Sequence, residues 1–391
     1  MKLGPFLRKR YTQLHELGRY ASTYIDYLIW LLIDMNKFKV IKTEEIDKVV
    51  VVLVNEDKGN VGGDFCLLGV MNYVKHAYPK VKLAILADSS TLKRFGEVPG
   101  IEMIEYKDKG TLEELKKKNI KAALFINIGE LKSKDFKFIP YRVAPFYPSI
   151  GAIFRFGYKI GYTRKAFIPW GLHMVDICFR MFETLGFKFD KKDVEFYFSK
   201  EEEKKVEEFI KRNKLKKFIV IHPGGKFVVE TLLKKKWPPH LWPLERYAEV
   251  ADYFSNKGYK VLISGTKEEN LLAEEIDKYS EKGVMNCCGV FSISEMGALL
   301  SKAKLLISTD TSIVHIAYQV KVPIVELMGP SCPEVVGAWP IDSERNKILF
   351  DSGPCARSMK KTECPEDIIC MENIKVKEVI EESEKMLNKF T

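Results

Sequence analysis

Apolar runs of strand length alternate with stretches of helical spacing along most of the chain. The first series opens with DKVVVVLV at residues 47–54, which predicts a buried strand. An apolar helix follows Asp64, and a charged helix is predicted over residues 111–119. The other predicted elements of this series are strands over residues 81–87, 101–106, 122–128 and 158–162 and an amphipathic helix over residues 173–185.

The alternation restarts after residues 188–216, a strongly charged segment that predicts a connection with its own helix. Strands are then predicted over residues 218–221, 259–264, 284–288, 304–308 and 323–328, and helices over residues 241–256, 267–279, 294–302, 313–320 and 376–388. Strands separated by helices indicate doubly wound parallel sheets. The fold class is therefore α/β, with two Rossmann-like domains facing a cleft. The expected boundaries are an extension at 1–46, a first domain at 47–190, a connection at 191–216 and a second domain at 217–391.

The N-terminal extension, residues 1–46, has a basic start and an amphipathic helical pattern. Its apolar centre, residues 27–33, lies between Asp26 and Asp34 and is too short to span a bilayer. Aromatic and basic residues around that centre suit a helix in a membrane interface. A helix packed on the first domain or on a dimer partner fits the pattern equally well.

Composition and charge narrow the class of partner. The chain has 391 residues, is 46% hydrophobic and 30% charged, and carries a formal net charge of +10, so it is a globular protein that suits an anionic partner. Nucleic acid, an acidic membrane and a phosphorylated substrate all fit that charge. No secretory signal opens the sequence, so we expect a cytoplasmic protein with reduced thiols. Cys355, Cys364 and Cys370 lack CxxC spacing, which disfavours a zinc site.

Residues 304–330 read as strand, loop, helix and strand. The loop holds Thr309, Asp310, Thr311 and Ser312, whose side chains are predicted to cap the helix. It falls at the carboxyl edge of the sheet, where open α/β sheets bind ligands and a helix start favours a phosphate. An ordinary capped helix inside a core is the alternative.

The glycine-rich turn ending at Gly63 brings Asp64 to the carboxyl edge of the first strand. A carboxylate there is placed to act as a general base. The alternative is an N-cap, which spacing alone favours because Asp64 precedes a helix. The turn lacks the GxGxxG fingerprint, which disfavours a dehydrogenase.

A second candidate loop spans residues 223–239. Gly224 and Gly225 precede three lysines, including Lys235, and such a loop can hold a diphosphate. A solvated surface run is the alternative. His315 lies four residues after Thr311, so both can share one helix face. His315 and His222 each suit either a ligand contact or a structural hydrogen bond.

Taken in order, these motifs resemble glycosyltransferase family 9, the heptosyltransferases of lipopolysaccharide assembly. The resemblance covers roughly residues 47–385. It is carried by Gly63-Asp64, by Pro223-Gly224-Gly225 with Lys235-Lys236-Trp237-Pro238, by Ser264–Glu269, by Ser308–Ser312 with His315 and Ala317, by Gly329-Pro330 and by the late cysteine cluster. The sequence departs from the family pattern at Ser312, where glycine is usual, and at Cys332, where aspartate is common.

The resemblance implies a GT-B fold whose first domain binds the acceptor and whose second binds a nucleotide-sugar, typically ADP-heptose. By that carry-over Asp64 is the base, Lys235 holds the diphosphate, and Glu268 or Glu269 contacts the ribose. The remaining implied donor contacts are Gly224, Gly225, Asp310, Thr311, Ser312 and His315. Transfer inverts the anomeric carbon and uses no metal and no cofactor.

The resulting hypothesis is an inverting glycosyltransferase that moves a heptose or related sugar onto an anionic lipid-linked saccharide. Its expected location is the cytoplasmic face of the inner membrane, which residues 1–46 would contact, and nucleic acid is not an expected partner. Two alternatives remain: a non-catalytic protein that binds a nucleotide-sugar or saccharide, and a nucleotide-sugar epimerase of similar fold.

Overall fold

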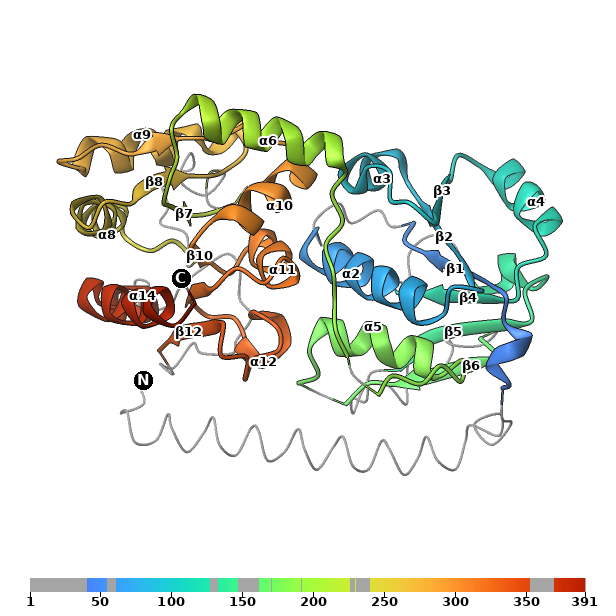
Figure 1. The fold of residues 1–391 in the computed structure, drawn as a ribbon. Coiled ribbons are helices and arrows are strands. Elements are labelled where there is room, and N and C mark those ends of the chain that lie inside the picture. Colours follow the sequence, from blue (N-terminus) through green and yellow to red (C-terminus); the bar gives the residue numbers. More distant parts are fainter. Residues whose placement is uncertain are drawn as a thin grey trace, which may run out of the picture. The chain divides into compact units, whose positions relative to one another are not determined.

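A computed structural model describes residues 41–54, 61–126, 133–146, 162–169, 171–190, 192–225, 229, 240–351 and 369–390. The chain divides into two compact units, Met1–Glu195 and Phe196–Thr391, whose elements are labelled in Figure 1. Within the described ranges, no helix is both long enough and apolar enough to cross a membrane. The predicted extension lies mostly outside these ranges, and its described end, residues 41–46, holds a short 3-10 helix, η2 (Thr43–Glu45).

The described strands of the first unit form a parallel sheet in the order β3-β2-β1-β4-β5-β6. The strands are β1 (Lys48–Val52), β2 (Lys82–Ala87), β3 (Ile101–Glu105), β4 (Ala122–Phe125), β5 (Tyr141–Phe146) and β6 (Arg164–Phe167). The helices are α2 (Val61–Ala77), α3 (Ser89–Phe95), α4 (Lys109–Lys117) and α5 (Met174–Glu183), with η3 (Ser133–Phe136) between β4 and β5. The chain order reverses between β1 and β4, which makes that position the switch point of the sheet.

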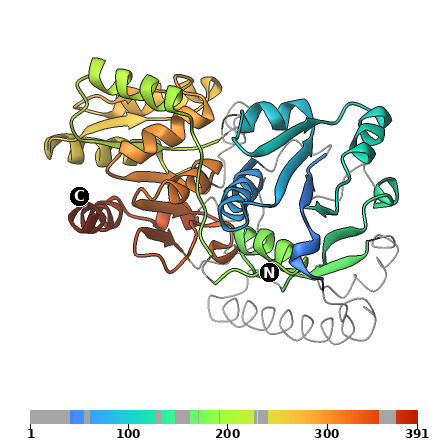
Figure 2. The same ribbon diagram turned by 45° about the vertical axis from the view of Figure 1, so that its right-hand side comes forward.

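Both faces of this sheet are covered, which is why β1 reads as an unbroken apolar run. Helices α2 and α5 pack against each other, and Figure 2 shows them on one side of the strands with α4 on the other. On the α4 side, Leu112 and Leu115 join a buried cluster with Val50, Val52 and Phe125.

The second unit repeats the same topology. Its described strands run β12-β11-β10-β7-β8-β9, all parallel, with the reversal between β7 and β10. The strands are β7 (Phe218–His222), β8 (Lys260–Ile263), β9 (Met285–Asn286), β10 (Leu306–Thr309), β11 (Ile324–Met328) and β12 (Asn346–Phe350). The helices are α6 (Lys200–Arg212), α8 (Leu244–Asn256), η5 (Lys267–Glu269), α9 (Asn270–Tyr279), α10 (Ile293–Lys302), α11 (Ser312–Gln319), α12 (Pro333–Val336), α13 (Ile369–Asn373) and α14 (Val376–Phe390).

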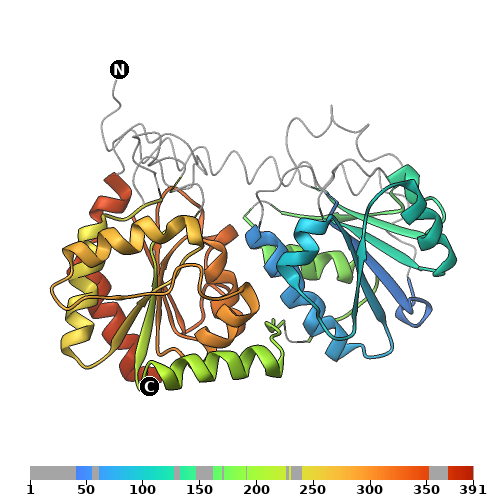
Figure 3. The ribbon, with the colours of Figure 1, turned by 90° about the horizontal axis from the view of Figure 1, so that it is seen from above.

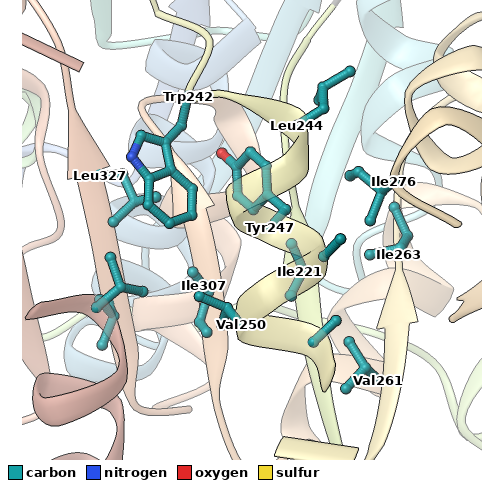
Figure 4. Close-up of a cluster of buried hydrophobic side chains, with 14 of the residues drawn as sticks. Ile221, Trp242, Leu244, Tyr247, Val250, Val261, Ile263, Ile276, Ile307 and Leu327 are labelled. Carbon is teal, nitrogen blue, oxygen red and sulfur yellow. The ribbon is translucent and has the colours of Figure 1, made fainter. Parts of the chain in front are cut away.

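Two helical layers enclose this second sheet. Figure 3 shows α8, α9 and α14 on one face and α10 and α11 on the other, in agreement with the contacts between these elements. The first layer buries a cluster built around Trp242 and Tyr247, drawn in Figure 4 with strand residues such as Ile221 and Ile307. The indole Nε1 of Trp242 donates to the carbonyl of Ile374 at 3.0 Å, so this large ring is buried with its polar atom paired.

The predicted doubly wound α/β fold is confirmed in both units. Helix α6 falls inside the predicted connection, residues 191–216, and packs on α10 of the second unit. Most bounds agree within a few residues, but β5, β6 and β12 were not predicted, and the strand predicted over residues 158–162 lies almost wholly outside the described ranges. The missed strands carry polar residues such as Arg142 and Arg164, and β6 and β12 are edge strands, where the apolar pattern is weakest.

Candidate functional site

The second unit brings two predicted loops together at its switch point. Strands β7 and β10 are adjacent, with His222 paired in register to Ser308, so the loops that follow them start side by side. The hydroxyl of Thr309 donates to the carbonyl of Pro223 at 3.4 Å. A Cβ placed on Gly225 would lie 3.8 Å from both Thr311 Cγ2 and Glu269 Oε1. Glycine therefore leaves open backbone beside a carboxylate and a helix start.

A capping box fixes that carboxylate. Glu269 Oε2 accepts the backbone N–H of Thr266 at 2.5 Å, and the Thr266 side chain accepts an N–H in return. Glu269 is 2% exposed, and among the described residues its Oε1 has no hydrogen-bond partner. Its neighbour Glu268 is exposed. Of the two glutamates in the predicted ribose contact, Glu269 is the one buried at the switch point.

The start of α11 differs from the prediction in one respect. Thr311 is the N-cap residue, but its side chain makes no capping hydrogen bond, so the predicted side-chain cap is wrong. Its hydroxyl lies 3.3 Å from the hydroxyl of Ser308 instead. The Thr311 hydroxyl is paired with Ser308 and does not cap the first backbone N–H groups of α11. That geometry keeps the helix start suited to an anion.

The two histidines near this edge are both largely buried. His315 is 5% exposed and meets the Tyr318 ring edge-on at 5.8 Å between ring centroids. Nδ1 of His222 lies 3.0 Å from the hydroxyl of Ser264. Burial lowers the pKa of His222, although the charge of Glu269 opposes that shift, so the imidazole is neutral near pH 7.

A buried glutamate that was not singled out from the sequence lies one strand further along. Glu326 in β11 is fully buried and pairs in register with Ser308. Its Oε2 accepts the N–H of Ala338 at 2.8 Å, whereas Oε1 has no hydrogen-bond partner among the described residues. Burial, followed by the nearby charge of Asp310, raises the pKa of Glu326 well above its usual range. A neutral Glu326 leaves Asp310 without a second negative charge beside it.

In the first unit, Asp64 lies in the first turn of α2, which begins at Val61, so its interpretation as an N-cap is wrong. The Arg94 guanidinium donates through Nη2 to Asp64 Oδ2 at 2.7 Å. Asp64 is 8% exposed, and burial raises the pKa of its carboxyl, while the Arg94 hydrogen bond and charge act against that rise. Sequence reasoning missed Arg94 because nothing in a separation of thirty residues signals the contact.

For the remaining predicted residues the structure gives the burial of some, while others lie outside the described ranges. Gly224 is buried after β7, and Asp310 and Ser312 are partly exposed at the end of β10 and the start of α11. Lys235 lies outside the described residues, as do Cys355 and Cys364. Cys370 is buried in α13. In the part of the chain that the structure describes, no group of three or more His, Cys, Asp or Glu side chains could hold a metal ion.

Solved structures share this architecture. The glycosyl transferase family 9 protein from Veillonella parvula DSM 2008 matches with a TM-score of 0.69 at 20% identity, covering 88% of this chain and 97% of that chain. The E. coli heptosyltransferase WaaC with ADP-2-deoxy-2-fluoro heptose matches with a TM-score of 0.60 at 14% identity, covering 86% and 99%. Together with the two parallel sheets, these likenesses define a GT-B fold.

The family follows from the sequence comparisons. The model of glycosyltransferase family 9 (heptosyltransferase) matches residues 152–368, more than half of the chain. Lipopolysaccharide heptosyltransferase 3 of Escherichia coli (strain K12) is 24% identical over 334 residues, which cover 81% of this chain and 93% of that protein. The chain therefore belongs to glycosyltransferase family 9 and is a glycosyltransferase. That class disfavours both the non-catalytic binding protein and the epimerase.

Proposed function

We propose that this enzyme transfers a heptose or a related sugar from a nucleotide-sugar to an anionic lipid-linked saccharide such as lipopolysaccharide core. The observation that carries the proposal is the switch point of the second unit, where Gly225, Thr311 and Glu269 converge. ADP-heptose is the proposed donor, supported by the ADP-heptose analogue named with WaaC and by the name of the Escherichia coli relative.

The donor contacts divide by chemistry. The proposed contacts to the diphosphate and the sugar beside it are the backbone of Gly224 and Gly225 and the uncapped start of α11, with Asp310, Thr311 and Ser312. Lys235 supplies a positive charge to the diphosphate. Oε1 of Glu269 is available to accept a hydrogen bond from a ribose hydroxyl, and Glu268, beside it on η5, is the alternative. His315, the fourth residue of α11, completes the proposed set.

The proposed reaction is a single displacement. The carboxylate of Asp64 takes the proton of an acceptor hydroxyl while that oxygen attacks the anomeric carbon of the sugar. The bond from the anomeric carbon to the diphosphate oxygen breaks, and the nucleoside diphosphate leaves with its electron pair. Lys235 and the N–H groups at the start of α11 stabilise the charge on the leaving group. Attack opposite to the leaving group inverts the anomeric carbon.

The proposed place of action is the cytoplasmic face of the inner membrane, where a lipid-linked acceptor is presented. The net charge of +10 favours an anionic acceptor and an anionic surface. Residues 1–46 are the proposed peripheral contact, because their amphipathic pattern suits an interface. We propose no metal, no cofactor and no nucleic-acid partner.

Calorimetric titration tests the donor. The purified protein is titrated with ADP-heptose, ADP and the UDP- and GDP-sugars, and the series is repeated on Lys235→Ala with Lys234→Ala as the matched control. We expect selective binding of ADP and ADP-heptose, weakened about 10- to 100-fold in Lys235→Ala alone, the size of a lost charged hydrogen bond. Selective binding of UDP- or GDP-sugars would overturn the choice of ADP-heptose.

A further inference from the structure

The proposed base, Asp64, forms a largely buried ion pair with Arg94. Asp64 is 10% exposed at its side chain and Arg94 22%, so both charges are largely removed from water. A carboxylate in such a place favours its protonated form unless an opposite charge is close. A protonated carboxyl cannot accept the acceptor's proton. Arg94 therefore favours the ionised form of Asp64, which is the form that a general base needs.

The arginine is itself held in place by a chain of hydrogen bonds. Arg94 Nη2 also donates to the Thr91 hydroxyl at 2.9 Å. That hydroxyl donates to Asp88 Oδ2 at 2.9 Å. Asp88 is the N-cap of α3, where its other oxygen accepts the N–H groups of Ser90 and Thr91. The guanidinium is thus tied to the start of its own helix before it reaches Asp64.

An aromatic contact fixes the two helices on which the ion pair is built. Phe65 and Phe95, the residues that follow Asp64 and Arg94 in sequence, are buried and meet edge-to-face at 6.2 Å between ring centroids. Such a pair contributes about 1 kcal/mol beyond the area it buries. The aromatic contact therefore joins α2 and α3 next to the ion pair.

The two oxygens of Asp64 have different surroundings. Oδ2 accepts from Arg94, whereas among the described residues none donates a hydrogen bond to Oδ1. The Asp64 side chain as a whole keeps 10% of its surface exposed. Arg94 thus holds one carboxylate oxygen, Oδ2, and does not occupy the other.

We propose that Arg94 is a positioning residue for Asp64: it holds Oδ2, keeps the buried carboxylate ionised, and leaves Oδ1 to take the proton of the acceptor hydroxyl. This inference rests on the proposed function, in which Asp64 is the base. Arg94 itself touches neither the donor nor the acceptor in this scheme.

The other ionisable groups near Asp64 do not replace Arg94. The negative charge of Asp88 on α3 opposes ionisation of Asp64. Cys178 of α5 is fully buried, and burial, with Cys66, Asp176 and Asp64 also contributing, raises its thiol pKa well above the usual range, so it is neutral near pH 7. Among the described residues, Arg94 is the positive charge that acts on Asp64.

The test compares pH profiles of transfer for the wild-type enzyme, Arg94→Met, Arg94→Lys and the control Lys93→Ala, an exposed neighbour on α3. In Arg94→Met we expect kcat/KM to fall at least 10-fold at pH 6.5, with its acid limb moved to higher pH and the loss recovered as the pH rises. Arg94→Lys, which keeps the charge, should lie between the two, and Lys93→Ala should match the wild type. An equal loss at every pH in Arg94→Met would overturn the inference.

A measurement without substrate separates this inference from the proposed function. The carboxyl carbon of Asp64, assigned in ¹³C-aspartate protein by its absence in Asp64→Asn, is titrated by NMR in wild type and both Arg94 variants. We expect the pKa of Asp64 to rise in Arg94→Met and to rise less in Arg94→Lys. An unchanged titration overturns the role of Arg94 even if Asp64→Asn abolishes transfer. If the pKa of Asp64 rises in Arg94→Met but Asp64→Asn keeps full activity, Arg94 does keep Asp64 ionised, yet Asp64 is not the base. That result would overturn the role of Arg94 as a positioning residue.

Discussion

Replacing Glu326 with glutamine should stabilise the second unit, and the gain should grow with pH. Glu326 is fully buried in β11, and burial and then the charge of Asp310 raise its pKa well above the ordinary value of 4.5. In the unfolded chain the same carboxyl ionises near that ordinary value. Between those two pKa values the folded state holds a proton that the unfolded state has released, so stability falls as the pH rises.

The size of the effect follows from this linkage. Each pH unit above 4.5 at which folded Glu326 stays protonated costs about 1.4 kcal/mol of folding stability. Glutamine keeps nearly the same shape and does not ionise, so Glu326→Gln removes this dependence of stability on pH. Its amide packs differently around Ala338, but that offset does not depend on pH. The difference in stability between variant and wild type should therefore rise from pH 5 to pH 7, by up to about 1.4 kcal/mol per pH unit.

Urea unfolding of the full chain at several pH values, followed by tryptophan fluorescence, measures this slope. Trp242 and Trp339 are both buried in the second unit and report on it. Glu378→Gln, at an exposed position of α14, is the matched control and should give a flat difference. A difference for Glu326→Gln that is equally flat from pH 5 to pH 7 would show that Glu326 is ionised in the folded protein, and the reasoning would fail.

Two further predictions concern the donor site and the membrane. A methyl group on Gly265 would lie 2.9 Å from Cys288 Sγ and 3.0 Å from Glu269 Oε2, so Gly265→Ala should destabilise the second unit by about 1–3 kcal/mol and weaken ADP binding by displacing Glu269. Thermal unfolding measures the loss of stability and calorimetry measures ADP affinity. An unchanged ADP affinity would contradict a contact between Glu269 and the nucleotide. Deleting residues 1–40 should abolish sedimentation with vesicles that contain anionic lipid, whereas retained binding would contradict the proposed interfacial helix.

The sequence predicted the sheets well because parallel strands buried on both faces have a simple pattern. Residues 49–52 are all valine and all buried, and every residue of β10 and β11 is buried as well. Strands that mix polar and apolar residues were not predicted. Tyr141 and Arg142 open β5, and Arg164 and Lys165 open β6, so neither strand has the alternation or the apolar run that marks a strand.

The candidate site was predictable where spacing along the chain carries the information. The loops after β7 and β10 were each predicted to bind a ligand, and the structure shows that the two strands are neighbours. Contacts between distant residues could not be inferred. Arg94 reaches Asp64 across two helices, and the choice between Glu268 and Glu269 as the buried carboxylate depends on a capping box whose geometry only the fold shows.

The most direct test of the central claim is heptosyl transfer by Asp64→Asn, with ADP-heptose binding measured on the same preparation. Asparagine keeps the size of the side chain but cannot take a proton at neutral pH. We expect kcat to fall by about 10²–10⁴-fold, the usual contribution of a general base, while the Kd for ADP-heptose stays within about threefold. Transfer at a rate within a few-fold of wild type would contradict the assignment of Asp64 as the base and the displacement mechanism built on it.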